Sequence, residues 1–202
     1  MNTIIDGVKT KYLIIHPKDC TTDFLCNSYK DIPNKLVVRD VTISKSNLKK
    51  LIKFHDVIIM LGHGVSEGLI CSNKPIKEEN IEPLFGRLLI NSELVQELRE
   101  KLCIGIWCHA SDFFEKYRLI GFSTGMFISD LWEADQYSFP LNENWIDESN
   151  NMLGKSISET YCKSPKEIYN KFIENFTKLR NNKIAEFNYL EFRFYEKSKE
   201  NY

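Results

Sequence analysis

The stretch that decides the fold is Val57-Ile58-Ile59-Met60-Leu61-Gly62-His63-Gly64. Its first five residues are all apolar, which is typical of a short strand that is covered on both faces. The strand ends on a histidine between two glycines, which permit a tight turn and the close approach of another backbone. We therefore expect a buried parallel strand that delivers an imidazole to one edge of a sheet.

A second stretch, Cys103-Ile104-Gly105-Ile106-Trp107-Cys108-His109-Ala110-Ser111, has the same form and ends on a cysteine. In an open α/β sheet, the carboxyl ends of parallel strands meet in one crevice. A thiol needs a neighbouring imidazole to become a good nucleophile near neutral pH. The two stretches together predict a hydrolase with Cys108 as the nucleophile and His63 as its base.

The alternative for each of these residues is a structural role. Cysteine is a common core residue, and we interpret Cys103 in this way because it opens the strand. His63 in isolation would be a histidine that caps a strand. His109 is next to Cys108 in the sequence, but neighbours in an extended chain point to opposite sides, so we do not expect it to be the base.

Apolar periodicity, caps and turn residues predict the other elements. The strands are expected at 11–16, 35–39, 57–61, 103–107, within 118–128 (near 125–128) and within 185–195, and a hairpin is expected to begin at 68–72. The helices are expected at 22–30, 44–54, from 91 or 92 to 102, 149–161 and 165–180, the last opening on a capping box of Ser164 and Glu167. This order predicts a mostly parallel central sheet with helices on both faces.

Composition narrows the class of protein. The 202 residues fit a single domain spanning 1–202, and 27 basic against 28 acidic residues remove the general electrostatic argument for nucleic acid or an acidic membrane surface. The start of the chain shows no signal peptide and no apolar run reaches the length of a membrane helix, so we expect a cytoplasmic protein with free thiols. No CxxC pair indicates zinc, and we expect no metal and no cofactor.

The two blocks, 57–64 ending in His-Gly and 104–108 ending in Cys, resemble those of the caspase-like cysteine peptidases, which include caspases, metacaspases, gingipains, clostripain, separase and bacterial CHAT-type proteases. The gap of 45 residues from His63 to Cys108 is similar to that of the family. The run 121–129 resembles the next core strand of the bacterial members. The resemblance covers about residues 10 to 135 and implies a three-layer caspase-like sandwich.

The resemblance also implies a mechanism. Cys108 would attack a peptide carbonyl, His63 would protonate the leaving amine and activate water, and the backbone amides of Gly64 and Cys108 would form the oxyanion hole. The sequence departs from the caspase pattern Gln-Ala-Cys-Arg-Gly, because Ile-Trp-Cys-His-Ala stands here and Trp107 is bulky where a small residue is usual. Some relatives are activated by calcium, but no loop of the EF-hand type indicates it here.

Relatives differ in the residue they accept before the cut, which is Asp in caspases and Arg or Lys in metacaspases and gingipains. The loops expected to line that pocket carry more acids than bases, which favours a basic substrate side chain, although each acid alone would ordinarily be a solvated surface charge. The candidate pocket residues are Asp19, Asp23, Asp130, Trp132 and Glu133. The expected partner is a protein or peptide substrate, with regulation by self-association or a separate protein.

Two other functions compete with the peptidase. The first is a catalytically silent caspase-like module that binds partners, since function lies in the site rather than in the fold. The second is a small-molecule-binding protein of flavodoxin or response-regulator type, suggested by the glycines of residues 62–68. That stretch lacks the GxGxxG spacing and no Walker lysine follows it, which disfavours the second alternative.

Overall fold

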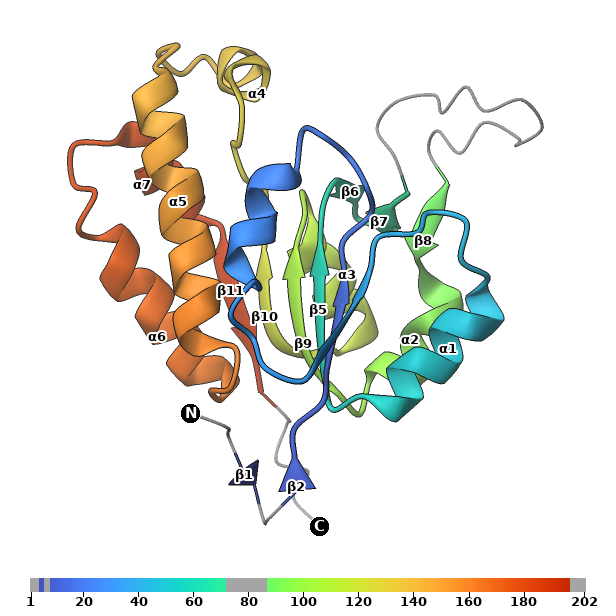
Figure 1. Cartoon of the computed structure of the whole chain (residues 1–202). Helices are drawn as coiled ribbons and strands as arrows, with labels where there is room; N and C mark the ends of the chain where they lie inside the picture. Colours follow the sequence, from blue (N-terminus) through green and yellow to red (C-terminus); the bar gives the residue numbers. More distant parts are fainter. Residues whose placement is uncertain (1–3, 6–7, 72–86, 197–202) are drawn as a thin grey trace.

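The computed structural model describes residues 4–5, 8–71 and 87–196. At its centre lies a six-stranded sheet in the order β4-β3-β5-β9-β10-β11 (Figure 1). Its strands are β3 (Tyr12–Ile15), β4 (Lys35–Val38), β5 (Val57–Leu61), β9 (Leu102–Ile106), β10 (Ile120–Thr124) and β11 (Phe192–Tyr195). Neighbouring strands are parallel except for β11, which runs antiparallel to β10. The predicted α/β sandwich with a mostly parallel sheet is confirmed.

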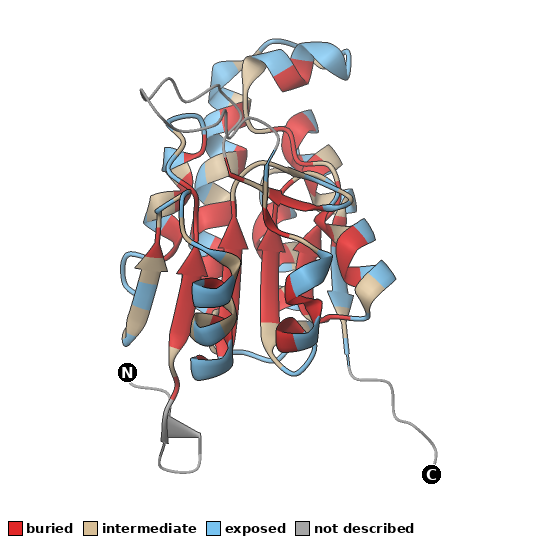
Figure 2. Cartoon of the chain, turned by 90° about the vertical axis from the view of Figure 1, so that its right-hand side faces the viewer, coloured by how far each residue is buried: buried red, intermediate tan, exposed pale blue. Residues whose placement is uncertain are grey.

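The middle of the sheet is buried on both faces, which explains its unbroken apolar sequence. Every residue of β3 and β5 is buried (Figure 2). Side chains alternate between the faces of a strand, so Ile58 and Met60 pack into one hydrophobic cluster while Ile59 and Leu61 pack into another. Helices are therefore needed on each side of the sheet.

The first helical layer is built from segments that connect the parallel strands. It contains α1 (Lys45–Phe54), the 3₁₀ turn η2 (Ser92–Leu94), α2 (Val95–Leu98) and α3 (Ala110–Tyr117). Leu48 and Ile52 of α1 and Phe113 and Phe114 of α3 belong to the cluster on this face. Ser44 caps α1, and its side chain accepts a hydrogen bond from the amide of Asn47.

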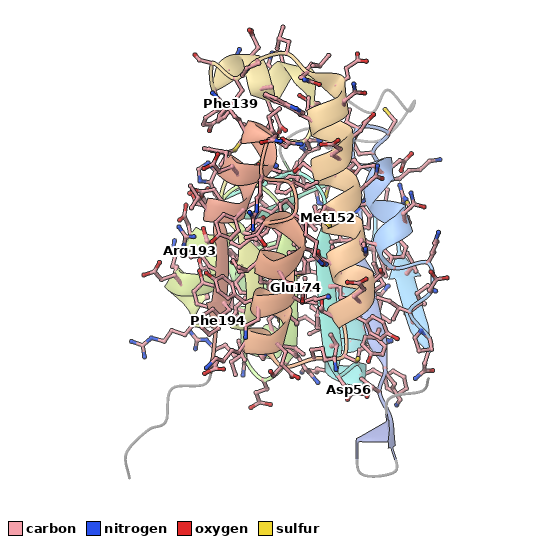
Figure 3. All side chains as sticks on the ribbon, turned by 90° about the vertical axis from the view of Figure 1, so that its left-hand side faces the viewer. Asp56, Phe139, Met152, Glu174, Arg193 and Phe194 are labelled. Carbon is pink, nitrogen blue, oxygen red and sulfur yellow. The ribbon has the colours of Figure 1, made fainter. Side chains whose placement is uncertain are left out.

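The second layer contains η1 (Asp23–Ser28), α5 (Glu143–Thr160), α6 (Pro165–Phe176) and α7 (Lys183–Leu190). Leu25 of η1, Leu153 of α5 and Phe172 of α6 belong to the cluster that covers this face of the sheet. Figure 3 looks onto this layer, with Met152 marking α5 and Glu174 marking α6. The predicted capping box that opens α6 at Ser164 is confirmed.

A short helix, α4 (Leu131–Gln136), lies beyond the arrowheads of the parallel strands in Figure 1. It belongs to a third apolar cluster that joins Ile128 and Ala134 to Ile146 of α5 and Ile184 of α7. Asp130 caps it by accepting a hydrogen bond from the amide of Glu133. The segment after β10 is thereby held over the carboxyl edge of the sheet.

A second, three-stranded sheet follows β5. Its strands are β6 (Gly64–Val65), β7 (Gly68–Ile70) and β8 (Leu88–Ile90), all paired antiparallel. The hairpin predicted to begin at 68–72 is confirmed as far as residue 71, and residue 72 lies outside the described residues. Near the start of the chain, β1 (Ile4–Ile5) pairs with β2 (Val8–Lys9).

Three sequence predictions about element positions are wrong. The strand expected within 118–128 is present, but it lies at 120–124 rather than near 125–128, because residues 120–123 pair with β9 while the amides of Gly125 and Ile128 bond to residues 191 and 188. The segment 183–190 is helical, because Asn182 caps it and its buried positions follow a helical spacing; only Phe192–Tyr195 forms a strand. The helix expected to run to residue 102 ends at Leu98, and residue 102 already belongs to β9.

Two short helices that the sequence did not indicate, α3 and α4, follow β9 and β10 after short connecting segments. The helix expected from residue 149 begins at Glu143, where Asn142 provides the cap. Within the described ranges, no helix combines the length and the apolar composition that a membrane crossing requires.

Candidate active site

Strand register brings the two candidate catalytic residues to one edge of the sheet. Leu61 of β5 pairs with Ile106 of β9, and the amide of Gly62 continues the ladder with a 3.0 Å hydrogen bond to the carbonyl of Ile106. His63 lies two residues beyond Leu61, and Cys108 lies two residues beyond Ile106. Because β5 and β9 are adjacent and parallel, both chains leave the sheet at the same carboxyl edge.

The glycines around His63 are required by geometry. Gly62 has φ of +142°, a backbone conformation that L side chains rarely adopt. At Gly64 a Cβ would lie 2.0 Å from Cδ1 of Trp107, so only glycine lets the indole pack this closely. The indole Nε1 of Trp107 donates a 3.1 Å hydrogen bond to the carbonyl of Val65. The buried indole of Trp107, next to Cys108 in the sequence, thus packs against the segment that follows His63.

The imidazole of His63 is held by a short polar chain. Its Nε2 lies 2.7 Å from Oγ1 of Thr21, and that hydroxyl donates to Oδ1 of Asp19 at 2.7 Å. A hydroxyl has one hydrogen to donate, so the Nε2–H of His63 must donate to the Thr21 oxygen. In a neutral imidazole held in this way, Nδ1 carries the lone pair that a general base needs.

The side chain of Cys108 is half-buried and points to the opposite side of the chain from the indole of Trp107. Its Sγ lies 3.9 Å from the carbonyl oxygen of Phe127 and 4.0 Å from Oε1 of Glu133. Burial, followed by the charge of Glu133, raises the pKa of Cys108 to about 12. Backbone contacts at Phe127 and at Cys108 itself act in the opposite direction. The thiol is therefore protonated at neutral pH.

Glu133 of α4 places a buried carboxyl beside the thiol of Cys108. It is 7% exposed, and its Oε2 accepts hydrogen bonds from the amide and the hydroxyl of Ser129 at 2.7 and 2.9 Å. Burial raises the pKa of Glu133, the Ser129 hydrogen bonds oppose that rise, and His63 is among the weaker influences that lower it. The carboxyl of Glu133 thus lies in contact with the thiol of Cys108.

A small pocket of about 20 Å³, room for about one water molecule, lies beside the sulfur of Cys108. It lies between the ends of β5 and β9 and the second helical layer. Its lining residues are Thr22, Phe24, Leu25, Gly62, Ile106, Trp107, Cys108, Phe127, Ser129 and Leu153. The space beside the thiol is therefore about the size of one water molecule.

A larger pocket of about 510 Å³ shares Ser129 with the first and is rich in acids. It is lined by Asp130, Leu131 and Trp132 around α4, and by Glu143, Ile146, Asp147 and Asn150 of α5. The side chain of Trp132 is 70% exposed. Two of the five candidate pocket residues, Asp130 and Trp132, therefore lie together in this acidic pocket.

The other three candidate pocket residues lie elsewhere. Asp19 binds Thr21 in the chain that leads to His63. Asp23 forms an ion pair with Arg39, at 2.5 Å. Glu133 lies beside Cys108 rather than in the acidic pocket.

The two amides proposed for the oxyanion hole have distinct surroundings. The amide of Ile70 donates to the carbonyl of His63, so Gly64 takes the non-hydrogen-bonded position of the β6–β7 pair and its amide points away from β7. The amide of Cys108 lies beside its own sulfur. His109 has a left-handed backbone, is exposed, and lies 3.3 Å from the carboxylate of Asp112.

Sequence reasoning did not identify Thr21 and Ser129 as parts of the site. Both are small hydroxyl residues in segments that follow strands β3 and β10, the only local signal that could have indicated them.

Among the described residues, no group of three or more His, Cys, Asp or Glu side chains is arranged to hold a metal ion. Comparison with models of known protein families and with curated proteins finds no match for this sequence.

Proposed function

We propose that this chain is a cysteine-type peptidase that uses Cys108 as the nucleophile and His63 as the general base. The observation that carries the proposal is the pairing of Leu61 with Ile106, which sends both residues to one edge of the sheet. The hydrogen bond from His63 to Thr21 adds to it, because this bond occupies Nε2 and leaves Nδ1 as the ring nitrogen available to act as a base. The resemblance of the two blocks to the caspase-like peptidases points to the same chemistry.

The raised pKa of Cys108 determines how the reaction would start. A thiol with a pKa of about 12 is not a preformed thiolate at neutral pH. In the proposed mechanism, His63 takes the thiol proton as the sulfur attacks the peptide carbonyl, and then passes that proton to the leaving amine. Water, activated by His63, hydrolyses the thioester and releases the free thiol. The amides of Gly64 and Cys108 would stabilise the oxyanion, and such a donor contributes roughly 3 kcal/mol in related sites.

The substrate proposed is a peptide with a basic side chain before the scissile bond. The acidic pocket offers Asp130, Glu143 and Asp147 close to Ser129, which also lines the pocket beside Cys108. A lysine or arginine there would gain ion pairs, and Trp132 could stack on its aliphatic stem or guanidinium.

The hydrogen bond from His63 to Thr21 gives the proposal its own test. Thr21→Val removes the hydroxyl that holds the imidazole, so we expect kcat to fall about tenfold, in line with other changes to groups that orient a catalytic or metal-bound histidine. KM should change little, because Thr21 is absent from the linings of both pockets. Thr21→Ser keeps the hydroxyl and should retain most of the activity. Equal loss in both variants would mean that the hydroxyl does not position His63.

A catalytically silent binding module remains a second candidate, and one observation favours it. Burial and the carboxylate of Glu133 both oppose ionisation of Cys108, which is the opposite of what a constitutively active thiol needs. In this alternative the same pockets bind a peptide without cleaving it. The two functions differ in turnover and not in peptide preference.

A positional-scanning peptide library on the purified protein tests the proposal. We expect cleavage after lysine or arginine, and no cleavage by Cys108→Ala or by His63→Ala. Cys162→Ala, which changes another half-buried cysteine, should cleave normally. Turnover that survives in folded Cys108→Ala would exclude Cys108 as the nucleophile. Peptide binding without turnover in the wild type would favour the silent module.

A further inference from the structure

The residue Cys26 lies in a second cluster of reactive side chains, separate from Cys108. The helix η1 is a 3₁₀ helix, in which side chains three residues apart lie on the same face. Asp23 and Cys26 therefore stack on one face, and Tyr29, which follows the helix, continues it. The neighbouring face carries Thr22 and Leu25, which line the pocket beside Cys108; Cys26 is absent from that lining.

Donor groups surround the sulfur of Cys26. The guanidinium of Arg39, which follows edge strand β4, donates to Sγ at 2.6 Å, and the hydroxyl of Tyr29 donates to it at 3.2 Å. The Nδ1 of His16 lies 3.8 Å from the same sulfur. Arginine remains charged at any physiological pH, so a cation faces this sulfur permanently.

The cluster is held in place by groups around it. Asp23 binds the same guanidinium at 2.5 Å and so fixes Arg39 against the sulfur. Burial, followed by the charge of Arg39, lowers the pKa of His16 to about 4, so the imidazole is neutral at physiological pH. Burial also raises the pKa of Tyr29 to about 12, so its phenol keeps the proton that it can donate.

We propose that Cys26 is a site of reversible oxidation by hydrogen peroxide or a related hydroperoxide, and that Arg39 makes it so. Negative charge on sulfur is stabilised by a neighbouring cation and hydroxyl donor, and low-molecular-weight oxidants react with sulfur in that form. This inference does not depend on the peptidase, because it concerns a different cysteine and a different face of η1.

The reaction is a two-electron exchange. The sulfur of Cys26 attacks one oxygen of the peroxide, the O–O bond breaks, and an S–O bond forms. The other oxygen leaves as hydroxide and takes up the proton lost by the thiol, which gives one water and one sulfenic acid. The sulfur is oxidised by two electrons and the peroxide is reduced by two. An external thiol reverses the reaction through a mixed disulfide.

The other cysteines of the chain provide internal comparisons. Cys20 is exposed, so access to oxidant favours it over the half-buried Cys26. Burial raises the pKa of both Cys103 and Cys108 to about 12, so both should react slowly. Faster oxidation of Cys26 than of Cys20 would therefore show that its surroundings, rather than its access to solvent, govern the rate.

The experiment treats the full chain with limiting hydrogen peroxide at pH 7 in the presence of dimedone, and quantifies the adduct at each cysteine by peptide mass spectrometry. We expect Cys26 to be labelled at least tenfold faster than Cys20 in the folded protein, and the two rates to converge in urea. Arg39→Met should slow labelling at Cys26 at least tenfold and leave Cys20 unchanged. Lys30→Met, which removes an exposed cation just after η1, should change neither rate.

Two results would overturn the proposal. The first is a rate at Cys26 no greater than that at Cys20 in the folded wild type, a comparison that needs no variant. The second is an unchanged Cys26 rate in folded Arg39→Met. If Arg39→Met does not fold, Arg39→Lys replaces it, because lysine keeps the charge and loses the planar fork of the guanidinium. A folded Arg39→Lys should then be oxidised more slowly at Cys26. An unchanged rate at Cys26 in that variant would also overturn the proposal.

Discussion

The carboxyl of Glu133 is the neighbour that most directly opposes ionisation of Cys108, and Glu133→Gln tests its effect. Oε1 of Glu133 lies 4.0 Å from the sulfur. Two unit charges at this separation repel by about 4 kcal/mol at an effective dielectric constant of about 20. At about 1.4 kcal/mol per pKa unit this sets an upper bound of about 3 units, and because burial is the larger cause of the raised pKa, removal of the charge should lower the pKa of Cys108 by about one unit.

The glutamine variant should keep the local structure. Its side-chain oxygen can still accept the hydrogen bonds that Ser129 donates to Glu133. Burial, the largest cause of the raised pKa of Cys108, is unchanged by the substitution. The pKa should therefore fall from about 12 toward the ordinary thiol range without passing below it.

The assay is the pH dependence of alkylation of Cys108 by iodoacetamide, quantified by mass spectrometry of the peptide that contains it. In Glu133→Gln the rate at pH 8 should rise about tenfold over the wild type. Asp130→Asn is the matched control, because Asn also caps helices and Asp130 is a weaker influence on Cys108 than Glu133. A shift of less than half a pKa unit in Glu133→Gln, or an equal shift in both variants, would refute the reasoning.

Two further predictions concern stability. The pKa of buried His16 falls from 6.5 to about 4 on folding. Its contribution to the free energy of unfolding is therefore complete above pH 6.5 and is lost as the pH falls toward 4. Urea titrations should show a loss of about 3 kcal/mol over this range in the wild type and no such loss in His16→Gln. An unchanged pH slope in His16→Gln would contradict this. Gly64→Ala puts a methyl 2.0 Å from the buried ring of Trp107 and should lower the free energy of unfolding by about 1–3 kcal/mol in thermal denaturation. The control is Gly154→Ala in α5, where the nearest atom lies 3.8 Å away and the alanine should be neutral or stabilising. Equal destabilisation by the two alanines would argue against the close approach.

Features that depend on short sequence spacings could be predicted from the sequence. The apolar run of β5 indicates a strand because five successive side chains need burial on both faces. The capping box at Ser164 indicates a helix start because its partners are three residues apart. The convergence of Gly62–His63 and Cys108 follows from the rule that parallel strands end at the same edge.

Where local signals compete, the sequence misleads. The aromatic residues of 183–190 favour a strand by propensity, but Asn182 caps the segment as a helix. Ile184 and Ala185 then join two buried apolar clusters, and the side-chain amide of Asn188 donates to Ser149 of α5, which stabilises that helix. Packing against a distant part of the chain outweighs the weak intrinsic preference of a few residues.

The sequence by itself determined the parallel core and the edge to which His63 and Cys108 are delivered, because burial and strand direction follow from residue order. The tertiary structure alone decided what touches each of them: Thr21 is 42 residues from His63, and Glu133 is 25 residues from Cys108. Protonation depends on such contacts at a few ångströms, and these form only when loops from separate strands fold over the same edge. For the same reason the sequence shows Cys26 and Arg39 as ordinary residues, and only their packing between η1 and β4 brings a cation onto a sulfur.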